Sequence, residues 1–212
     1  MQTLTEHLLA SSLPDVFADA DVASLLGFPT SPRRYALVKR ALAAGELIRV
    51  RRGLYVLAER FRSRPLDLLS LAARIYGPSY ISLESALAQH DLIPEYVAVT
   101  TSSTFRRSRT FDTTLGRFEF RRTPLPTLAG VQRVEPAASA PYLLASPLRA
   151  LVDLAHDRPG VEMDLDYLVE SLRIDPPTLR KIGRQEFAAL AKRLPRGRAA
   201  TFLGRLRREL GK

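Results

Sequence analysis

Basic residues gather on two neighbouring segments near the start of this chain. Arg33, Lys39 and Arg40 recur within residues 32–44, and Arg51 and Arg52 stand together a few residues later. A guanidinium fork matches the guanine edge and the phosphate group, and a lysine supplies a point charge. Side chains of this kind, at this spacing, indicate binding of a polyanion rather than covalent chemistry.

The first basic segment has the signals of a helix. Pro32 suits the first helical position, Ser31 can cap it, and Gly45 can end it after Ala44. At 100° per residue, two faces separate, with Leu37 near their border. The outward face holds Arg33, Ala36, Lys39 and Arg40, and the core face holds Arg34, Tyr35, Val38, Ala41 and Leu42.

The flanking segments complete a winged helix-turn-helix over residues 1–60. Downstream, strands over residues 47–50 and 54–57 are predicted to pair around an Arg-Arg-Gly turn. Upstream, Asp19 or Asp21 can cap a helix that ends at Gly27, followed by a turn over residues 28–30. Thr3 and Glu6 have capping-box spacing for a first helix whose apolar stripe is Leu4, Leu8 and Leu9.

In such a fold, the basic helix would fill a major groove and the hairpin would grip the flanking backbone. The hydroxyls and N–H groups at the helix start could bind a phosphate, or could only cap the helix. A solvated basic face is the alternative for the whole set. The candidate DNA-binding residues are Thr30, Ser31, Arg33, Arg34, Lys39, Arg40, Arg49, Arg51 and Arg52.

Composition restricts the class of protein. The 212 residues include no cysteine, so neither disulfides nor a cysteine zinc site is expected. No apolar run is long enough for a membrane span, and the first residues lack the pattern of a signal peptide, so a cytoplasmic protein is expected. The net charge of +10 favours polyanionic partners, and residues 171–212 hold 12 basic but only 3 acidic residues.

A second domain of mixed α/β type is predicted over residues 65–212. Helices are expected at residues 66–75 and 82–90, and strands at 97–101, 106–111, 117–122 and 142–145. Residues 123–141 look like an irregular crossing. A helix opened by Ser146 and Pro147 should run to Ala155, and further helices are expected at residues 164–172, 185–194 and 198–210. The fold class is therefore α+β.

Two other basic groups lie in this domain. Arg106, Arg107 and Arg109 form a second basic surface that could bind a protein partner, that partner's nucleic acid or more DNA. A solvated strand edge explains them equally well. The arginines of the C-terminal helices could wrap nucleic acid, although a solvated amphipathic helix is the simpler interpretation.

Signals for catalysis are weak. The three histidines, His7, His90 and His156, are too far apart for metal-ligand spacing. Asp153 and Asp157 are one acidic pair without further ligands, and Glu119 beside Arg121 lacks the second acid that a nuclease strand needs. No phosphate-binding glycine loop or nucleophile elbow is present. We expect no enzyme activity, cofactor or metal.

Three stretches resemble the AbiEi family of antitoxins from type IV toxin–antitoxin systems. They are GELIRVRRGLYVL at residues 45–57, YISLESALAQHDLIPE at 80–95 with the following VAVTT and GRFEFRR, and LLASPLRALVDLA at 143–155. The chain departs from the family pattern where Leu148 and Arg149 replace a frequent Glu-Lys pair, and where Asp91 replaces a usual glycine.

The resemblance implies a DNA-binding antitoxin. Its winged helix would repress its own operon by binding inverted repeats, as a monomer in solution that binds DNA cooperatively. Its C-terminal domain would neutralise a nucleotidyltransferase-like toxin, typically without a stable complex. A direct toxin-binding module and a stand-alone winged-helix regulator remain the alternatives.

Overall fold

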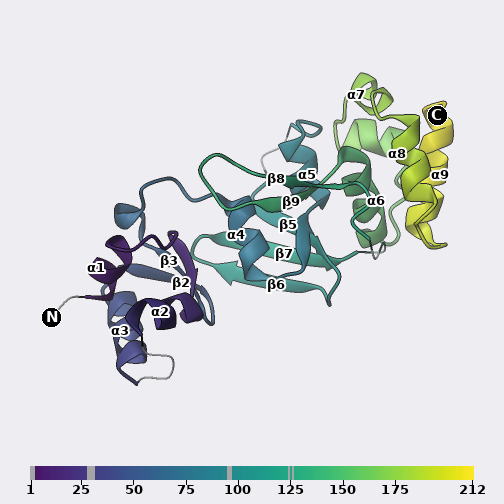
Figure 1. The fold of residues 1–212 in the computed structure, drawn as a ribbon. Coiled ribbons are helices and arrows are strands. Elements are labelled where there is room, and N and C mark those ends of the chain that lie inside the picture. The colour runs from purple at the N-terminus through teal and green to yellow at the C-terminus, as the bar shows by residue number, and fades with distance from the viewer. Residues whose placement is uncertain (1–2, 28–31, 95–96, 124, 126) are drawn as a thin grey trace. The chain divides into compact units, whose positions relative to one another are not determined.

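The computed structural model describes residues 3–27, 32–94, 97–123, 125 and 127–212 of a mixed α and β chain (Figure 1). It forms two compact units. Unit 1 comprises residues 1–67 and 111–115, and unit 2 comprises residues 68–110 and 116–212. Within the described ranges, no helix is both long and apolar enough to cross a bilayer.

Unit 1 consists of short helices around a small antiparallel sheet. The order of elements is α1 (Leu4–Leu9), β1 (Val16–Ala18), α2 (Asp19–Leu26), α3 (Pro32–Ala43), β2 (Leu47–Arg51) and β3 (Leu54–Leu57), followed by a 3-10 turn, η1 (Glu59–Phe61). In the sheet, β3 lies between β1 and β2. Strand β1 was not predicted, and it pairs with β3 so that Val16 lies opposite Val56.

Local hydrogen bonds explain where these helices begin and end. The Glu6 N–H donates to Thr3 Oγ1 at 3.2 Å and the Thr3 N–H to Glu6 Oε2 at 2.9 Å, which confirms the capping box. Asp21 accepts from the Ala18 N–H at 2.6 Å before α2. Gly27 and Gly45 follow α2 and α3 in the left-handed region, with φ of 67° and 64°.

The core of unit 1 corrects three predictions. Leu37 is buried with Val38 and Ala41, so it belongs to the core rather than to a border. Tyr35 is 58% exposed and Leu9 is 51% exposed, although both were expected to face inward. The buried side of α3 is therefore rotated towards Leu37. The core consists of Leu4, Leu8, Phe17, Val22, Leu37, Val38, Ala41, Leu47, Tyr55 and Leu57.

A mixed sheet has the order β6-β7-β5-β4-β9-β8, and its strands belong to unit 2 except for residues 111–113 at the end of β6. Its central strands carry the buried side chains, including Phe118 and Phe120, which share one face of β7 as predicted. Pairs β5–β7 and β4–β9 are parallel, whereas β4–β5 and β8–β9 are antiparallel. The strands are β4 (Ser79–Ile81), β5 (Val99–Thr104), β6 (Arg109–Thr113), β7 (Gly116–Arg122), β8 (Val131–Val134) and β9 (Tyr142–Ala145).

Helices complete unit 2, with α6 (Pro147–Asp157) buried over most of its length. This helix packs against α5 (Leu83–Gln89), β9, α8 (Arg184–Ala191) and α9 (Arg198–Glu209). Ser146 caps it, because its Oγ accepts from the Arg149 N–H at 3.2 Å. The other helices are α4 (Leu68–Ile75), the π-helix η2 (Tyr167–Ser171) and α7 (Pro176–Arg180).

Several predictions for unit 2 need correction. Strand β8 lies in the segment expected to be irregular, and the helix expected over residues 164–172 contains a π-helical turn. Ser82 precedes α5, but its hydroxyl donates to Asp153 at 2.8 Å instead of capping that helix. Asp91, where the family pattern has glycine, has a φ of 55°, a conformation that glycine adopts more readily.

Candidate nucleic-acid interface

The exposed side of α3 is basic. Arg33, Lys39 and Arg40 are all exposed, while Val38 and Ala41 face the core. The Arg40 Nε donates to the Ala36 carbonyl at 3.3 Å, which keeps the guanidinium along the helix surface. A hydrophobic inner side therefore fixes the helix and directs three cations to solvent, as the sequence predicted.

Arg34 is a correction to the predicted interface. Only 3% of it is exposed, and its Nη2 donates to Asp19 Oδ2 at 2.9 Å. Its guanidinium also lies 4.7 Å from the centre of the Tyr35 ring. Because Asp19 begins α2, this ion pair joins α2 to α3, and Arg34 is a structural residue in this fold.

The β2–β3 hairpin carries three more exposed cations: Arg49, Arg51 and Arg52. The register shifts between Arg49 and Arg51, and Gly53 closes the turn with a φ of 76°. The Arg51 Nη1 donates to the Arg52 carbonyl at 3.0 Å. The turn is anchored to α2, because the Asp19 N–H donates to the Gly53 carbonyl at 3.0 Å.

Two predicted DNA-binding residues, Thr30 and Ser31, lie outside the described residues. Opposite Arg49 in the hairpin stands Tyr55. Burial, and then the negative charge of Asp19, raise the pKa of the Tyr55 phenol, so it stays neutral at ordinary pH. The positive charge of the hairpin is thus not offset by that neighbour.

The second predicted basic surface is assembled around a ring in unit 2. Arg106 and Arg109 place their guanidinium groups 5.4 and 6.0 Å from the centre of the Tyr76 ring. The Tyr76 hydroxyl donates to the Arg107 carbonyl at 3.2 Å. All three arginines are exposed, so the structure brings them together, and their ligand stays a prediction.

A fully buried ion pair lies at the centre of unit 2. Arg149 Nε donates to both oxygens of Asp153 at 3.2 and 3.3 Å, and neither side chain is more than 1% exposed. Asp153 also accepts from the hydroxyls of Tyr80, Ser82 and Ser103 at 2.7–3.0 Å. Burial, and then the charge of Asp153, raise the pKa of Tyr80. This network is inaccessible to a ligand and holds α6 to the sheet.

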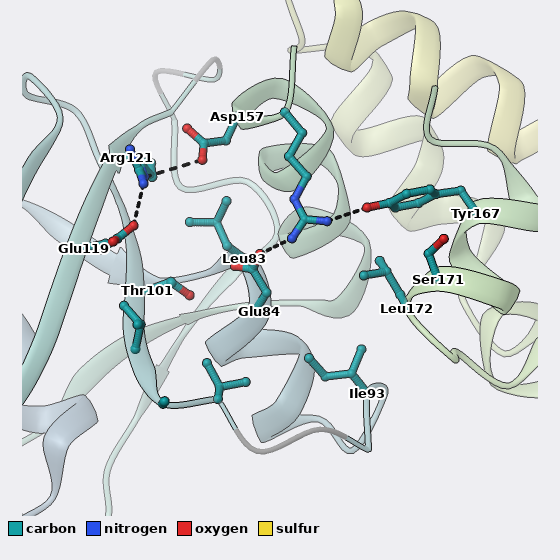
Figure 2. A pocket seen from close by; sticks show the side chains of 14 residues that line it. Leu83, Glu84, Ile93, Thr101, Glu119, Arg121, Asp157, Tyr167, Ser171 and Leu172 are labelled. Carbon is teal, nitrogen blue, oxygen red and sulfur yellow. Dashed lines mark hydrogen bonds and ion pairs between the residues drawn. The ribbon is translucent and has the colours of Figure 1, made fainter. Parts of the chain in front are cut away.

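A cavity of about 630 Å³ lies in unit 2 (Figure 2). The apolar residues that line it include Leu83, Ile93 and Leu172. Two arginines on its walls are paired with acids and with a phenol. Arg158 contacts Glu84 Oε1 and the Tyr167 hydroxyl, each at 2.5 Å, and Arg121 contacts Glu119 Oε2 at 2.5 Å and Asp157 Oδ2 at 3.5 Å.

The acids of the cavity have different environments. Burial opposes ionisation of Glu119, but hydrogen bonds and charges from Arg117 and Arg121 outweigh it and lower the pKa of Glu119. Burial dominates at Asp157 and raises the pKa of that carboxyl, although Arg121 opposes the shift. The sequence analysis named Glu119 with Arg121 and Asp157 with Asp153, and only the fold brings Asp157 to Arg121.

The acids of the cavity are held by arginines rather than grouped with one another. Over the described part of the chain, no three His, Cys, Asp or Glu side chains are grouped so that they could hold a metal ion. The cavity is thus a mixed-charge pocket whose cations are matched by its own acids, whereas the cations of α3 and of the hairpin face solvent.

Comparison with known families agrees with the basic N-terminal surface. Residues 8–58 match a family model described as "Transcriptional regulator, AbiEi antitoxin". This segment is therefore similar to AbiEi regulators. It includes α2, α3 and the basic hairpin, so the predicted resemblance is confirmed there. The description of that family names a transcriptional regulator and an antitoxin. No curated protein matches the chain.

Proposed function

We propose that this protein is a DNA-binding antitoxin that represses its own operon by binding inverted repeats. The observation that supports this most directly is the exposure of six cations on α3 and the adjacent hairpin, within the segment similar to AbiEi regulators. In this proposal, α1, α2, α3 and the β2–β3 hairpin act as a winged helix-turn-helix. Those cations are Arg33, Lys39, Arg40, Arg49, Arg51 and Arg52.

The two groups of cations would have different tasks. Arg33, Lys39 and Arg40 would enter the major groove, where an arginine fork reads guanine. The hairpin arginines would contact backbone phosphates, which position the protein but carry no sequence information. The core side of α3 fixes which side chains face the groove.

The test is binding to the DNA upstream of this gene, measured by fluorescence anisotropy and footprinting against a scrambled duplex. Substituting Arg33→Ala or Arg40→Ala should weaken specific binding by about 1–3 kcal/mol for each arginine that reads a base. Arg60→Ala is the matched control, because Arg60 is an exposed cation of unit 1 that lies on η1 and donates to the Ala44 carbonyl.

Protection of two inverted half-sites that survives competitor DNA would support the proposal. Equal binding of wild-type protein to operator and scrambled DNA would contradict it. A folded Arg33→Ala, Arg40→Ala double variant with unchanged operator affinity would contradict the proposal that α3 enters the major groove. Because we expect a monomer in solution, cooperative filling of the two half-sites should appear only on DNA that carries both.

For unit 2, we propose neutralisation of a nucleotidyltransferase-like toxin. Its separate core and its pocket give it the means to act independently of DNA binding. Growth rescue of cells that express the neighbouring gene tests this role. Co-elution of the two proteins in gel filtration would favour direct toxin binding through the pocket, whereas rescue without co-elution would favour neutralisation without a stable complex. Operator binding without growth rescue would favour the alternative that the protein is a stand-alone transcriptional regulator.

A further inference from the structure

The pocket of unit 2 lies on the polar face of the sheet. On β7, Phe118 and Phe120 are buried on one face of the strand. Glu119 and Arg121 lie on the opposite face and line the pocket (Figure 2). Thr101 of β5 stands opposite Glu119 in the register of the two strands and lines the pocket as well. The volume of about 630 Å³ falls within the range of about 300–1,000 Å³ that is typical of ligand pockets.

Two irregular backbone segments border the pocket. Leu83, the first residue of α5, has a φ of 55°, a left-handed conformation that is unfavourable for a bulky side chain. Tyr167 and Ser171 belong to the π-helical η2, and both line the pocket. Short π-helical turns and left-handed residues other than glycine are frequent at functional sites. Their meeting at one cavity indicates a ligand site rather than a packing gap.

The two arginines of the pocket already donate to protein acceptors. Arg158 contacts Glu84 Oε1 and the Tyr167 hydroxyl, each at 2.5 Å. Arg121 contacts Glu119 Oε2 at 2.5 Å. An anionic ligand would have to displace a carboxylate from one of these arginines before it could bind. The pocket therefore does not favour an anion, although it contains two guanidinium groups.

Asp157 is the carboxylate of the pocket with the weakest partner. Its Oδ2 lies 3.5 Å from Arg121 Nε, and no hydrogen bond joins its carboxylate to another described residue. Glu119, in contrast, is held by Arg117 at 2.8 Å as well as by Arg121. Burial raises the pKa of Asp157, and the negative charges of Glu84 and Glu119 add to this increase. A ligand that brings a positive charge to Asp157 would offset this repulsion.

The residues around Asp157 also indicate which kind of cation fits. Asp157 is the last residue of α6, and the C-terminal end of a helix favours positive charge. Quaternary ammonium groups are usually bound by several aromatic rings, but Tyr167 is the only aromatic residue among the described residues that line the pocket. A primary ammonium has three N–H donors for carboxylate acceptors. The aliphatic side chains of Leu83, Ile93 and Leu172 suit an apolar body attached to it.

We propose that the pocket binds a small organic primary amine, with the ammonium group beside Asp157 and an apolar body against Leu83, Ile93 and Leu172. A cavity of this volume accepts a whole small molecule, so the ligand is a free amine rather than a single lysine side chain of a protein. This binding is independent of the proposed function, because it requires neither DNA nor a toxin.

The experiment is isothermal titration calorimetry of the full chain without DNA. Three probes share one apolar body and differ in their terminal group: 4-phenylbutylamine, 4-phenylbutanol and 4-phenylbutyrate. The amine should bind at least about tenfold more tightly than the alcohol, because a hydrogen bond between two charged groups is stronger than a neutral one. The net charge of +10 would favour the carboxylate by general attraction, so a preference for the amine reports a local site.

An Asp157→Asn substitution should lower the affinity for the amine about tenfold and leave the affinity for the alcohol unchanged. The matched control is Asp175→Asn, which removes the same charge from an exposed aspartate of unit 2 outside the pocket and should change none of the three affinities. Ser171→Trp is a second variant, because a large ring at this exposed lining residue should weaken binding of amine and alcohol alike. Circular dichroism melting checks that each variant is folded.

Equal affinity for the amine and the alcohol, or tighter binding of the carboxylate, would overturn the proposal. An amine affinity that neither Asp157→Asn nor Ser171→Trp reduces would also overturn it, because the amine would then bind outside the pocket. Two further probes test the class of ligand. Tighter binding of the trimethylated amine would overturn the assignment to primary amines, and tighter binding of Nα-acetyl-lysine methylamide would overturn the assignment to a free small molecule.

Discussion

At the scale of single residues, the pair of Arg149 and Asp153 shows how charges can be buried. Arg149 also donates to the Thr127 and Ala129 carbonyls at 3.1 and 2.7 Å, so its Nη1 is satisfied as well. Ions removed from water are stable only when partners surround them. The hydroxyls and carbonyls of several strands and loops supply those partners, so this pair depends on the complete fold of unit 2.

We expect an Asp153→Asn substitution to lower the free energy of unfolding by about 3–5 kcal/mol, because it leaves a buried guanidinium without its counter-charge. Guanidinium unfolding followed by circular dichroism measures the change. Glu135→Gln is the control, since Glu135 and its partner Arg133 are mostly exposed and such pairs contribute about 0–1 kcal/mol. Similar losses in the two variants would contradict a structural role for the buried pair.

Glu119 gives a pH-dependent prediction. Its pKa in the folded protein is lowered from the ordinary value of 4.5, so its ionised form stabilises the fold above pH 4.5. This contribution is lost as the pH falls through the folded pKa. Asp157 has a raised pKa, so its contribution decreases instead as the pH rises above its ordinary 3.8.

We therefore expect Glu119→Gln to lose less stability than the wild-type protein when the pH falls below 4.5. Thermal melts at a series of pH values measure the difference. The substitution keeps the shape of the side chain and removes its titration, so the two curves should converge in acid. Parallel curves at all pH values would show that Arg117 and Arg121 do not hold this carboxylate in the folded protein.

At the scale of elements, sequence signals predicted the helix ends of unit 1 because these ends depend on local chemistry. A threonine with a glutamate three residues later and a glycine after an apolar stripe act within one turn of the chain. Such local signals could not predict which residues of α3 face the core. Periodicity placed both Arg34 and Tyr35 on the core side, but only Arg34 is buried, because Asp19, fifteen residues earlier, accepts a hydrogen bond from it.

Short strands were missed for a related reason. Strand β1 has three residues and β8 has four, too few for an alternating pattern to be distinguished from a loop. Each is stabilised by a neighbour distant in sequence, β3 for β1 and β9 for β8. The pocket was missed likewise, since Glu84, Glu119 and Asp157 come from α5, β7 and α6.

The hairpin and α3 should give different signatures in binding. An Arg51→Ala, Arg52→Ala variant should weaken binding to operator and scrambled DNA alike and lower the salt slope by roughly 2, because two phosphates no longer meet a cation. Arg33→Ala should instead reduce the preference for the operator. Anisotropy titrations at several salt concentrations measure both quantities. A hairpin variant with reduced operator preference and an unchanged salt slope would show that the hairpin reads bases.

At the scale of the whole molecule, the two units differ in charge, and the proposed function gives them different tasks. Unit 1 has a small net charge, although cations are exposed on α3 and the hairpin. This arrangement suits recognition of a DNA sequence more than non-specific electrostatic attraction to DNA. Unit 2 carries the strongly basic C-terminal segment and a pocket whose charges are matched internally. In the proposed function, unit 1 binds the operator and unit 2 neutralises the toxin.

This division predicts that repression and neutralisation can be separated by mutation. An Arg33→Ala, Arg40→Ala variant should lose repression of a promoter reporter, because two of the three cations proposed to enter the groove are gone. The same variant should still rescue growth of cells that express the toxin, because unit 2 has its own core and neither residue belongs to it. Reporter output and growth are measured in one strain, with protein levels checked by immunoblot. Loss of both activities at normal protein level would mean that neutralisation needs DNA binding, so the two units would not function independently.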